Sequence, residues 1–196
     1  MKPLVALLLS LLTGCPAYSA PPPGPVLVMG DSIFKFYTPY LQQTEPCVEH
    51  IPDNGRDTAY TLANLDNWIY SKPYSVIYFN AGIWDAGEGV PLDVYAANLR
   101  QIAARVKQSG ALPIFAATTP VPHGLEGRWR IRQYNRVAQQ VMAEQGIAVD
   151  DLYSLMIEFQ CLHLPGNVHY VDAGSWMLAQ HVAATLHAAG FCQGAP

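Results

Sequence analysis

Apolar and polar positions along the chain follow two alternating periods. Short apolar runs rich in Val, Ile, Phe and Tyr predict buried strands at 25–29, 47–51, 75–80, 112–117 and 147–150. Between them, apolar residues three or four positions apart predict helices through 36–43 and over 58–70, 92–109, 133–145 and 172–189. This alternation over the whole length predicts one layered α/β domain, a parallel sheet of about five strands with helices on both faces.

The composition narrows the class of protein. A chain of 196 residues has room for one hydrophobic core, and 51% hydrophobic with 13% charged residues is typical of a globular domain. The formal net charge is -4, and no run of Lys or Arg occurs. A nucleic-acid or anionic-membrane surface needs clustered positive charge, so we expect no nucleic-acid partner.

The N-terminus has the pattern of an export signal. Lys2 precedes the apolar run Leu4–Leu12, which is too short for the roughly 20 residues that span a bilayer. Leu12-Thr13-Gly14-Cys15 resembles a bacterial lipobox, with Cys15 as the lipidation site, whereas the small residues at 17–20 suit ordinary signal cleavage. We favour the lipobox because small residues and the cysteine directly follow the apolar run.

These features predict three segments and a location. They are a signal peptide at 1–20, a stiff proline-rich leader at 21–25 and the folded domain at 26–192. The mature protein is expected to be periplasmic or an outer-membrane-attached lipoprotein, and otherwise secreted. In an oxidising compartment cysteine pairs persist.

Three cysteines remain after such processing, enough for one disulfide. We expect Cys161 to pair with Cys192, with no bridge as the close alternative, and Cys47 to be a small buried hydrophobe. No His or Cys pair has metal-ligand spacing, so neither a metal nor another cofactor is expected.

Candidate chemistry lies at the carboxyl ends of the strands, where parallel sheets bind ligands. Gly30-Asp31-Ser32 leaves the first strand and enters a helix, which would place the Ser32 hydroxyl and its N–H at the rim of the sheet. The alternative is a turn whose Ser or Asp caps the helix. His169, in the loop before the last helix, is the candidate base for a serine nucleophile.

With further stretches in the same order, these residues resemble the SGNH (GDSL-type) hydrolase family. The resemblance runs from Val26 to about Leu186, through 30–33 with 37–40, 64–68, 79–85, 118–122, 134–135 with 151–153, and 167–170. It implies a flavodoxin-like, three-layer α/β/α fold and hydrolysis of carboxylic esters or thioesters through an acyl-enzyme on Ser32, with His169 as base.

The resemblance also implies an oxyanion hole, in which two positions depart from the family pattern. Gly55 fits the second block as a donor, although a plain turn glycine is the alternative. The third block, Gly-x-Asn-Asp in the wider family, has Trp84 in place of the Asn. Asn80 or Trp84 could supply the missing donor, and the alternative for Asn80 is a hydrogen bond that caps the strand end.

The last family block, Asp-x-x-His, has Gly166 where the orienting acid would stand. Asp85, Asp150 and Asp172 are the candidate replacements, although Asp172 is better placed to cap the final helix. We therefore predict a Ser32–His169 dyad and leave the third member open.

Two classes of function follow. The first is a serine esterase acting on acyl or acetyl esters of a small molecule, carbohydrate or lipid, with lysophospholipid or thioester hydrolysis as rival tasks. The second is a binding module that keeps the fold and has lost catalysis, which the missing Asn and Asp motivate. The oligomeric state is left open.

Overall fold

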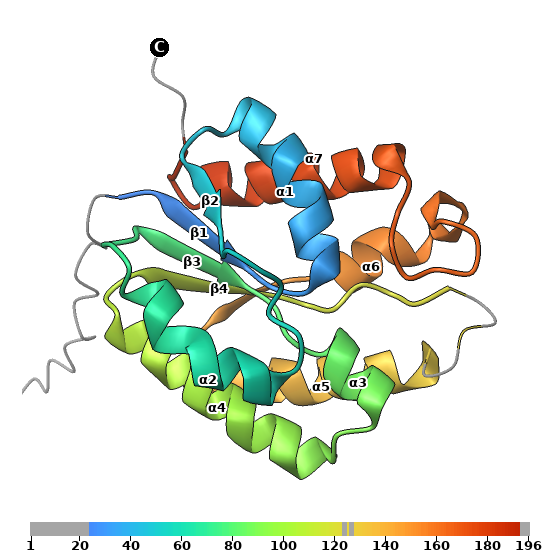
Figure 1. The fold of residues 1–196 in the computed structure, drawn as a ribbon, viewed down its shortest axis with the longest axis horizontal. Coiled ribbons are helices and arrows are strands. Elements are labelled where there is room, and N and C mark those ends of the chain that lie inside the picture. The colour runs from blue at the N-terminus through green and yellow to red at the C-terminus, as the bar shows by residue number, and fades with distance from the viewer. Residues whose placement is uncertain (1–23, 123–124, 126–127, 193–196) are drawn as a thin grey trace, which may run out of the picture.

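The fold is built on a five-stranded sheet in which every neighbouring pair is parallel. The computed structural model describes residues 24–122, 125 and 128–192, so the predicted signal peptide and Cys15 lie outside the described residues. The strand order is β2-β1-β3-β4-β5 (Figure 1). The strands are β1 (Val26–Met29), β2 (Val48–His50), β3 (Val76–Phe79), β4 (Leu112–Ala116) and β5 (Ala148–Asp150). The predicted parallel α/β sheet is confirmed.

Helices cover both faces of the sheet and complete three layers (Figure 1). One face carries α1 (Ser32–Thr44), α6 (Leu152–Ile157) and α7 (Asp172–Ala188). The other carries α2 (Thr58–Ile69), α3 (Ile83–Glu88), α4 (Leu92–Gln108) and α5 (Arg128–Gln145). Within the part of the chain described, no helix is long and apolar enough to cross a membrane.

The central strands are buried on both faces, which explains their continuous apolar runs. Val28 and Tyr78 point toward α1 and α7, whereas Met29 and Phe79, the next residue in each strand, point toward the opposite helices. These side chains form two apolar clusters separated by the sheet.

The sequence pattern misses three short elements: α3, α6 and a 3-10 turn at Gln160–Leu162. α3 and α6 have six residues each, too few for a helical period to show. In α3 the pattern is further hidden by Gly87 and by Gly89, whose φ of 72° ends the helix in the left-handed region. α5 begins at Arg128, earlier than the expected start at 133.

The expected disulfide is wrong. Cys47 pairs with Cys192, and Cys161 is a free, exposed thiol. The reason is the direction of α7, whose 17 residues span about 25 Å from the carboxyl to the amino end of the sheet. Cys161 precedes this helix and Cys192 follows it, so the two stand at opposite ends. Cys47, just before β2, lies at the same end as Cys192, with a Cα–Cα distance of 5.9 Å.

Candidate active site

The candidate nucleophile stands at the first residue of α1, directly after β1. Asp31 caps this helix: its carboxylate accepts hydrogen bonds from the N–H groups of Ile33 at 2.8 Å and Phe34 at 3.4 Å. Burial raises the pKa of Asp31 to about 6. Gly30 is required because a Cβ there would lie 2.5 Å from the Phe34 ring. Among the described residues nothing accepts the backbone N–H of Ser32, which leaves it free for an oxyanion.

A tight hairpin before α7 carries His169. Leu164-Pro165-Gly166-Asn167 forms its turn, in which the Asn167 N–H donates to the Leu164 carbonyl at 3.1 Å and Gly166 has a φ of 64°. Pro followed by Gly at the two central positions is typical of a type II turn. The Leu164 N–H donates to the His169 carbonyl at 2.8 Å and closes the hairpin. Gly166, which stands where the family has its orienting acid, therefore belongs to the turn that positions His169.

The His169 imidazole meets the serine directly. Its Nε2 lies 2.7 Å from the Ser32 Oγ, and the Phe36 ring packs edge-on against it with centroids 4.7 Å apart. Burial lowers the pKa of His169, which favours the neutral ring that accepts a serine proton. Among the described residues no carboxylate bonds to this imidazole.

The candidate orienting acids have other partners. Asp85 is buried and accepts from the Thr58 hydroxyl at 2.6 Å and the Thr58 N–H at 3.2 Å, which ties α3 to the start of α2. Asp172 lies in the first turn of α7, and its proximity raises the pKa of Tyr40. Val171 is the N-cap, so the expected capping by Asp172 is wrong. Neither acid orients His169 in this structure.

The candidate oxyanion donors, Gly55 and Asn80, have their hydrogens engaged elsewhere. The Gly55 N–H donates to the Gly30 carbonyl at 2.6 Å, and a Cβ at Gly55 would lie 3.0 Å from that oxygen. The Asn80 amide donates to the Ala116 carbonyl at 2.8 Å and to the Thr118 hydroxyl at 3.2 Å. Both residues take the alternative role, as a turn glycine and as a strand-end cap, and neither offers a free donor here.

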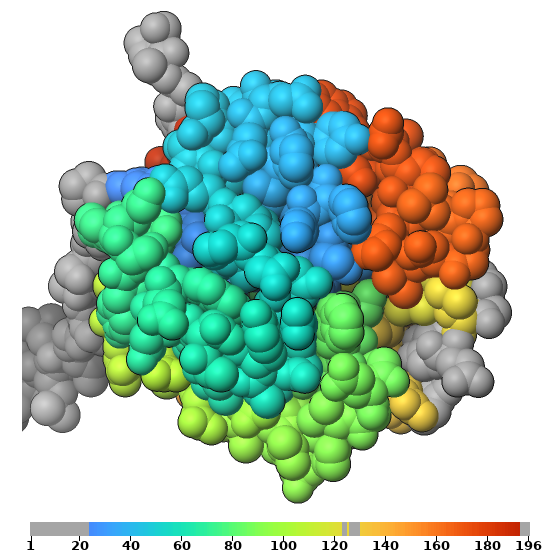
Figure 2. Space-filling view, in the orientation of Figure 1, coloured from blue at the N-terminus to red at the C-terminus, as the bar shows by residue number. Residues whose placement is uncertain are grey.

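An open cleft of about 350 Å³ contains the dyad. Its walls come from α1, α3 and the hairpin: Ser32, Ile83, Trp84, Gly87, Glu88, Val168 and His169. Figure 2 shows the orange segment that includes the hairpin beside the blue surface of α1 and the green surface of α3. Trp84, at the family's Asn position, is 37% exposed and forms part of this wall.

Potential metal ligands gather once among the described residues, at Glu45, Cys47 and Cys192. The two sulfurs of this group are bonded to each other, so they are not available as thiolate ligands.

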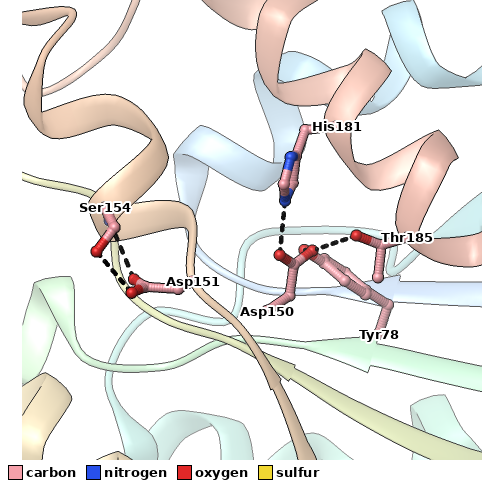
Figure 3. Close-up of polar contacts among 6 residues, drawn as sticks. All are labelled: Tyr78, Asp150, Asp151, Ser154, His181 and Thr185. Atoms are coloured by element: carbon pink, nitrogen blue, oxygen red, sulfur yellow. Dashed lines mark hydrogen bonds and ion pairs between the residues drawn. The ribbon is translucent and has the colours of Figure 1, made fainter.

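Asp150 belongs to a second polar cluster, between the sheet and α7 (Figure 3). Its carboxylate accepts from His181 Nε2 at 2.7 Å, the Tyr78 hydroxyl at 2.8 Å and the Thr185 hydroxyl at 2.9 Å. Burial raises the pKa of Asp150, but these bonds outweigh it and leave the pKa below its ordinary value. Asp151, the next residue, turns away and caps α6 through the Ser154 N–H at 3.0 Å.

The sequence patterns do not single out Phe36, Gly87 or Val168, which contact or line the site. Nor do they find a partner for His181. The spacing of His181 and Thr185, one turn apart on α7, could have indicated a shared acceptor. Residues four positions apart share one face of a helix and can meet one acceptor.

The chain belongs to the GDSL-like Lipase/Acylhydrolase family, whose model matches residues 28–187. With a parallel α/β sheet and a serine at the end of its first strand, the protein is an ester-hydrolysing enzyme of the SGNH type. A comparison with curated protein sequences found no match.

Solved structures share this fold at low sequence identity. A lipase/acylhydrolase from Enterococcus faecalis is 17% identical with a TM-score of 0.74, covering 85% of this chain and 96% of that one. An acetylxylan esterase from Geobacillus stearothermophilus is 19% identical with a TM-score of 0.67, covering 84% and 94%. The acetyl xylan esterase AlAXEase is 14% identical with a TM-score of 0.68, covering 82% and 98%. At these identities the likeness establishes the fold.

Proposed function

We propose that this protein is an exported serine esterase that hydrolyses O-acyl esters through an acyl-enzyme on Ser32. The observation that carries the proposal is the 2.7 Å contact between Ser32 Oγ and His169 Nε2. His169 takes the serine proton as Oγ attacks the ester carbonyl and returns it to the leaving alcohol. Water then attacks the acyl-enzyme with the same base, and the Ser32 N–H faces the oxyanion in both steps.

Several observations support the substrate class and the location. The family is one of lipases and acylhydrolases, and two of the similar structures are described as acetylxylan esterases. Acyl esters of a small molecule or a carbohydrate are therefore the proposed substrates. The export signal pattern and the Cys47–Cys192 disulfide both fit an oxidising compartment.

One feature favours a second candidate, a binding module of the same fold. Among the described residues no acid orients His169, and Gly55 and Asn80 have no free donor. Losing one oxyanion donor typically costs about 10²–10³ in turnover. In serine proteases, replacing the orienting Asp by Asn lowers turnover by about 10⁴, so a dyad of this kind is expected to be slow.

Labelling with a fluorophosphonate tests the proposal. The mature wild-type protein should gain one adduct and hydrolyse p-nitrophenyl acetate, whereas Ser32→Ala and His169→Ala should do neither. Ser154→Ala, which changes an exposed serine on α6, is the matched control and should label like wild type. A folded wild-type protein that neither labels nor hydrolyses the ester would favour the binding module.

The mass of the native N-terminus tests the proposed lipid anchor. A diacylglyceryl-modified Cys15 at the start of the mature chain is the expected result, whereas an unmodified terminus near Ala20 would reject the lipobox.

A further inference from the structure

A second cavity, of about 210 Å³, adjoins the catalytic cleft. The two cavities share Ile83, Gly87 and Val168 as walls, so the second one opens beside Ser32 and His169. The remaining walls of the second cavity are Ala86, Val121, Leu125 and Ile131. The second cavity therefore lies next to the catalytic cleft, between α3 and α5.

Among the described residues, the walls of this second cavity carry no charged or polar side chain: the seven that line it are Gly, Ala, Val, Leu or Ile. A sugar hydroxyl placed there would lose its water without gaining a side-chain hydrogen bond, at a cost of about 1–3 kcal/mol. A hydrocarbon chain would instead gain about 0.8 kcal/mol for each methylene removed from water. The lining therefore selects alkyl groups over sugars.

The walls are held by the core, so the cavity is formed before a ligand arrives. Ala86 and Ile131 are each 1% exposed, and Val121 is 5% exposed. Arg130 Nη1 donates to the Ala86 carbonyl at 3.3 Å, and the Tyr134 hydroxyl donates to the Val90 carbonyl. These two bonds from α5 fix α3 and the residues after it over the cavity.

We propose that this cavity is an acyl pocket, and that the enzyme prefers esters of medium-chain fatty acids to acetyl esters. The inference rests on the proposed function, because it places the acyl chain by its covalent bond to Ser32. Oγ bonds to the carbonyl carbon, the ester C–O bond breaks, and the alcohol leaves with the proton from His169. The alcohol must clear the cleft for water to enter, whereas the acyl chain remains and needs a place beside the serine.

Gly87 lies on the boundary between the two cavities, where a larger side chain would take up space in both. It lies in helical α3, lines both cavities, and has open space around an added Cβ, with nothing within 4 Å. Leu is a better helix former than Gly, so Gly87→Leu adds volume at this boundary without straining the backbone.

Hydrolysis of p-nitrophenyl esters from acetate to decanoate tests the pocket with a constant leaving group. For wild type, kcat/KM should rise by up to about fourfold per added methylene until the pocket is full. Gly87→Leu should lower the ratio of kcat/KM for octanoate to kcat/KM for acetate. Ala59→Leu, which adds a leucine at an exposed position of α2 outside both cavities, should keep the wild-type ratio.

Two kinetic outcomes would overturn the acyl pocket and leave the proposed function intact. One is Ser32-dependent hydrolysis with a flat acyl profile in wild type. The other uses acetate esters of alcohols from ethanol to octanol. If kcat/KM depends on chain length only in this alcohol series, and Gly87→Leu removes that dependence, the pocket holds the leaving group.

Binding gives a readout that does not depend on turnover. Calorimetry of Ser32→Ala should show octanoate binding more tightly than acetate, and the double variant Ser32→Ala/Gly87→Leu should lose that difference. Equal binding of the two acids by Ser32→Ala would overturn the pocket. Preferential octanoate binding by a protein that hydrolyses no ester would support the pocket and reject the proposed function.

Discussion

Two histidines near the C-terminal end of the chain have opposite surroundings. His181, on α7, donates to the buried Asp150 at 2.7 Å, and Tyr78 and Thr185 share the same carboxylate. His169, in the hairpin before α7, meets the Ser32 hydroxyl at the same distance of 2.7 Å and has no carboxylate partner among the described residues. The histidine paired with an acid is therefore not the one in the cleft.

The two environments move the two pKa values in opposite directions. The hydrogen bond to Asp150 raises the pKa of His181, which favours the charged ring that fastens α7 to β5. Burial alone lowers the pKa of His169, so this ring stays neutral near pH 7. A structural ion pair needs a charged imidazole and a general base needs a neutral one. The difference teaches that an Asp–His pair can mark packing as readily as catalysis.

Replacing each histidine by alanine in turn should give the largest effect, on activity for one variant and on stability for the other. His169→Ala is expected to lower kcat/KM for ester hydrolysis by about 10²–10⁴-fold, the usual contribution of a general base. His181→Ala should keep its activity and lose thermal stability instead. Initial rates and melting curves of both variants check this, and an inactive but fully stable His181→Ala would reverse the assignment.

Removing the Asp150 charge should give the next largest effect, on stability. Asp150→Asn is expected to lower the free energy of unfolding by about 1–2 kcal/mol, at the lower end for a charged hydrogen bond because His181 is partly exposed to screening solvent. The pKa of Asp150 is lowered from 3.8, so its contribution is present above pH 3.8 and lost as pH falls through the folded value. The pKa of His181 is raised from 6.5, so its contribution is present below pH 6.5 and lost as pH rises through the folded value.

The difference in stability between wild type and Asp150→Asn should therefore be greatest between pH 3.8 and 6.5. Denaturant unfolding at pH 5 and pH 8 measures it. Asp151→Asn is the matched control, because Asn caps a helix about as well as Asp and the exposed Asp151 carboxylate bonds to Ser154 of its own helix. An equal loss for the two variants would remove the structural role given to Asp150.

The acid limb of the pH profile should show a smaller effect. With its pKa lowered from 6.5 by burial, His169 should give a kcat/KM limb with a midpoint below pH 6.5. Phe36→Ala exposes the ring to water, so the midpoint should move up toward 6.5, and kcat should fall about two- to tenfold as the edge contact is lost. Phe159→Ala, another exposed aromatic, is the control. A wild-type midpoint above 6.5 would indicate an acid that pairs with His169.

The sequence predicts much of the fold because buried parallel strands are apolar runs and long amphipathic helices show their period. It misses α3 and α6, which are too short to show one. The disulfide could not be read from spacing, because pairing depends on which end of the sheet each cysteine reaches. Cys47 and Cys192 are 145 residues apart in sequence and meet only in the finished fold.

The site follows the same division. Ser32 and His169 stand next to recognisable elements, a strand end and the start of the last helix, and the structure brings them together. The Gly55 N–H and the Asn80 amide both donate to backbone carbonyls of other segments, which leave no trace in residue type, and Asn80 also donates to the Thr118 hydroxyl. The cleft and its side cavity depend on α3, the element that the pattern did not show.

The bridge between Cys47 and Cys192 turns most of the domain into a covalent ring. One junction lies just before β2 and the other just after α7, so the ring contains β2, β3, β4, β5 and every helix except α1. In the chain-entropy description, closing a loop of this size costs the denatured chain about 5 kcal/mol of conformational freedom. Because its ends meet only when the first and last parts of the domain are side by side, the ring locks a completed fold, and a reducing agent would release that contribution without disturbing a residue of the cleft.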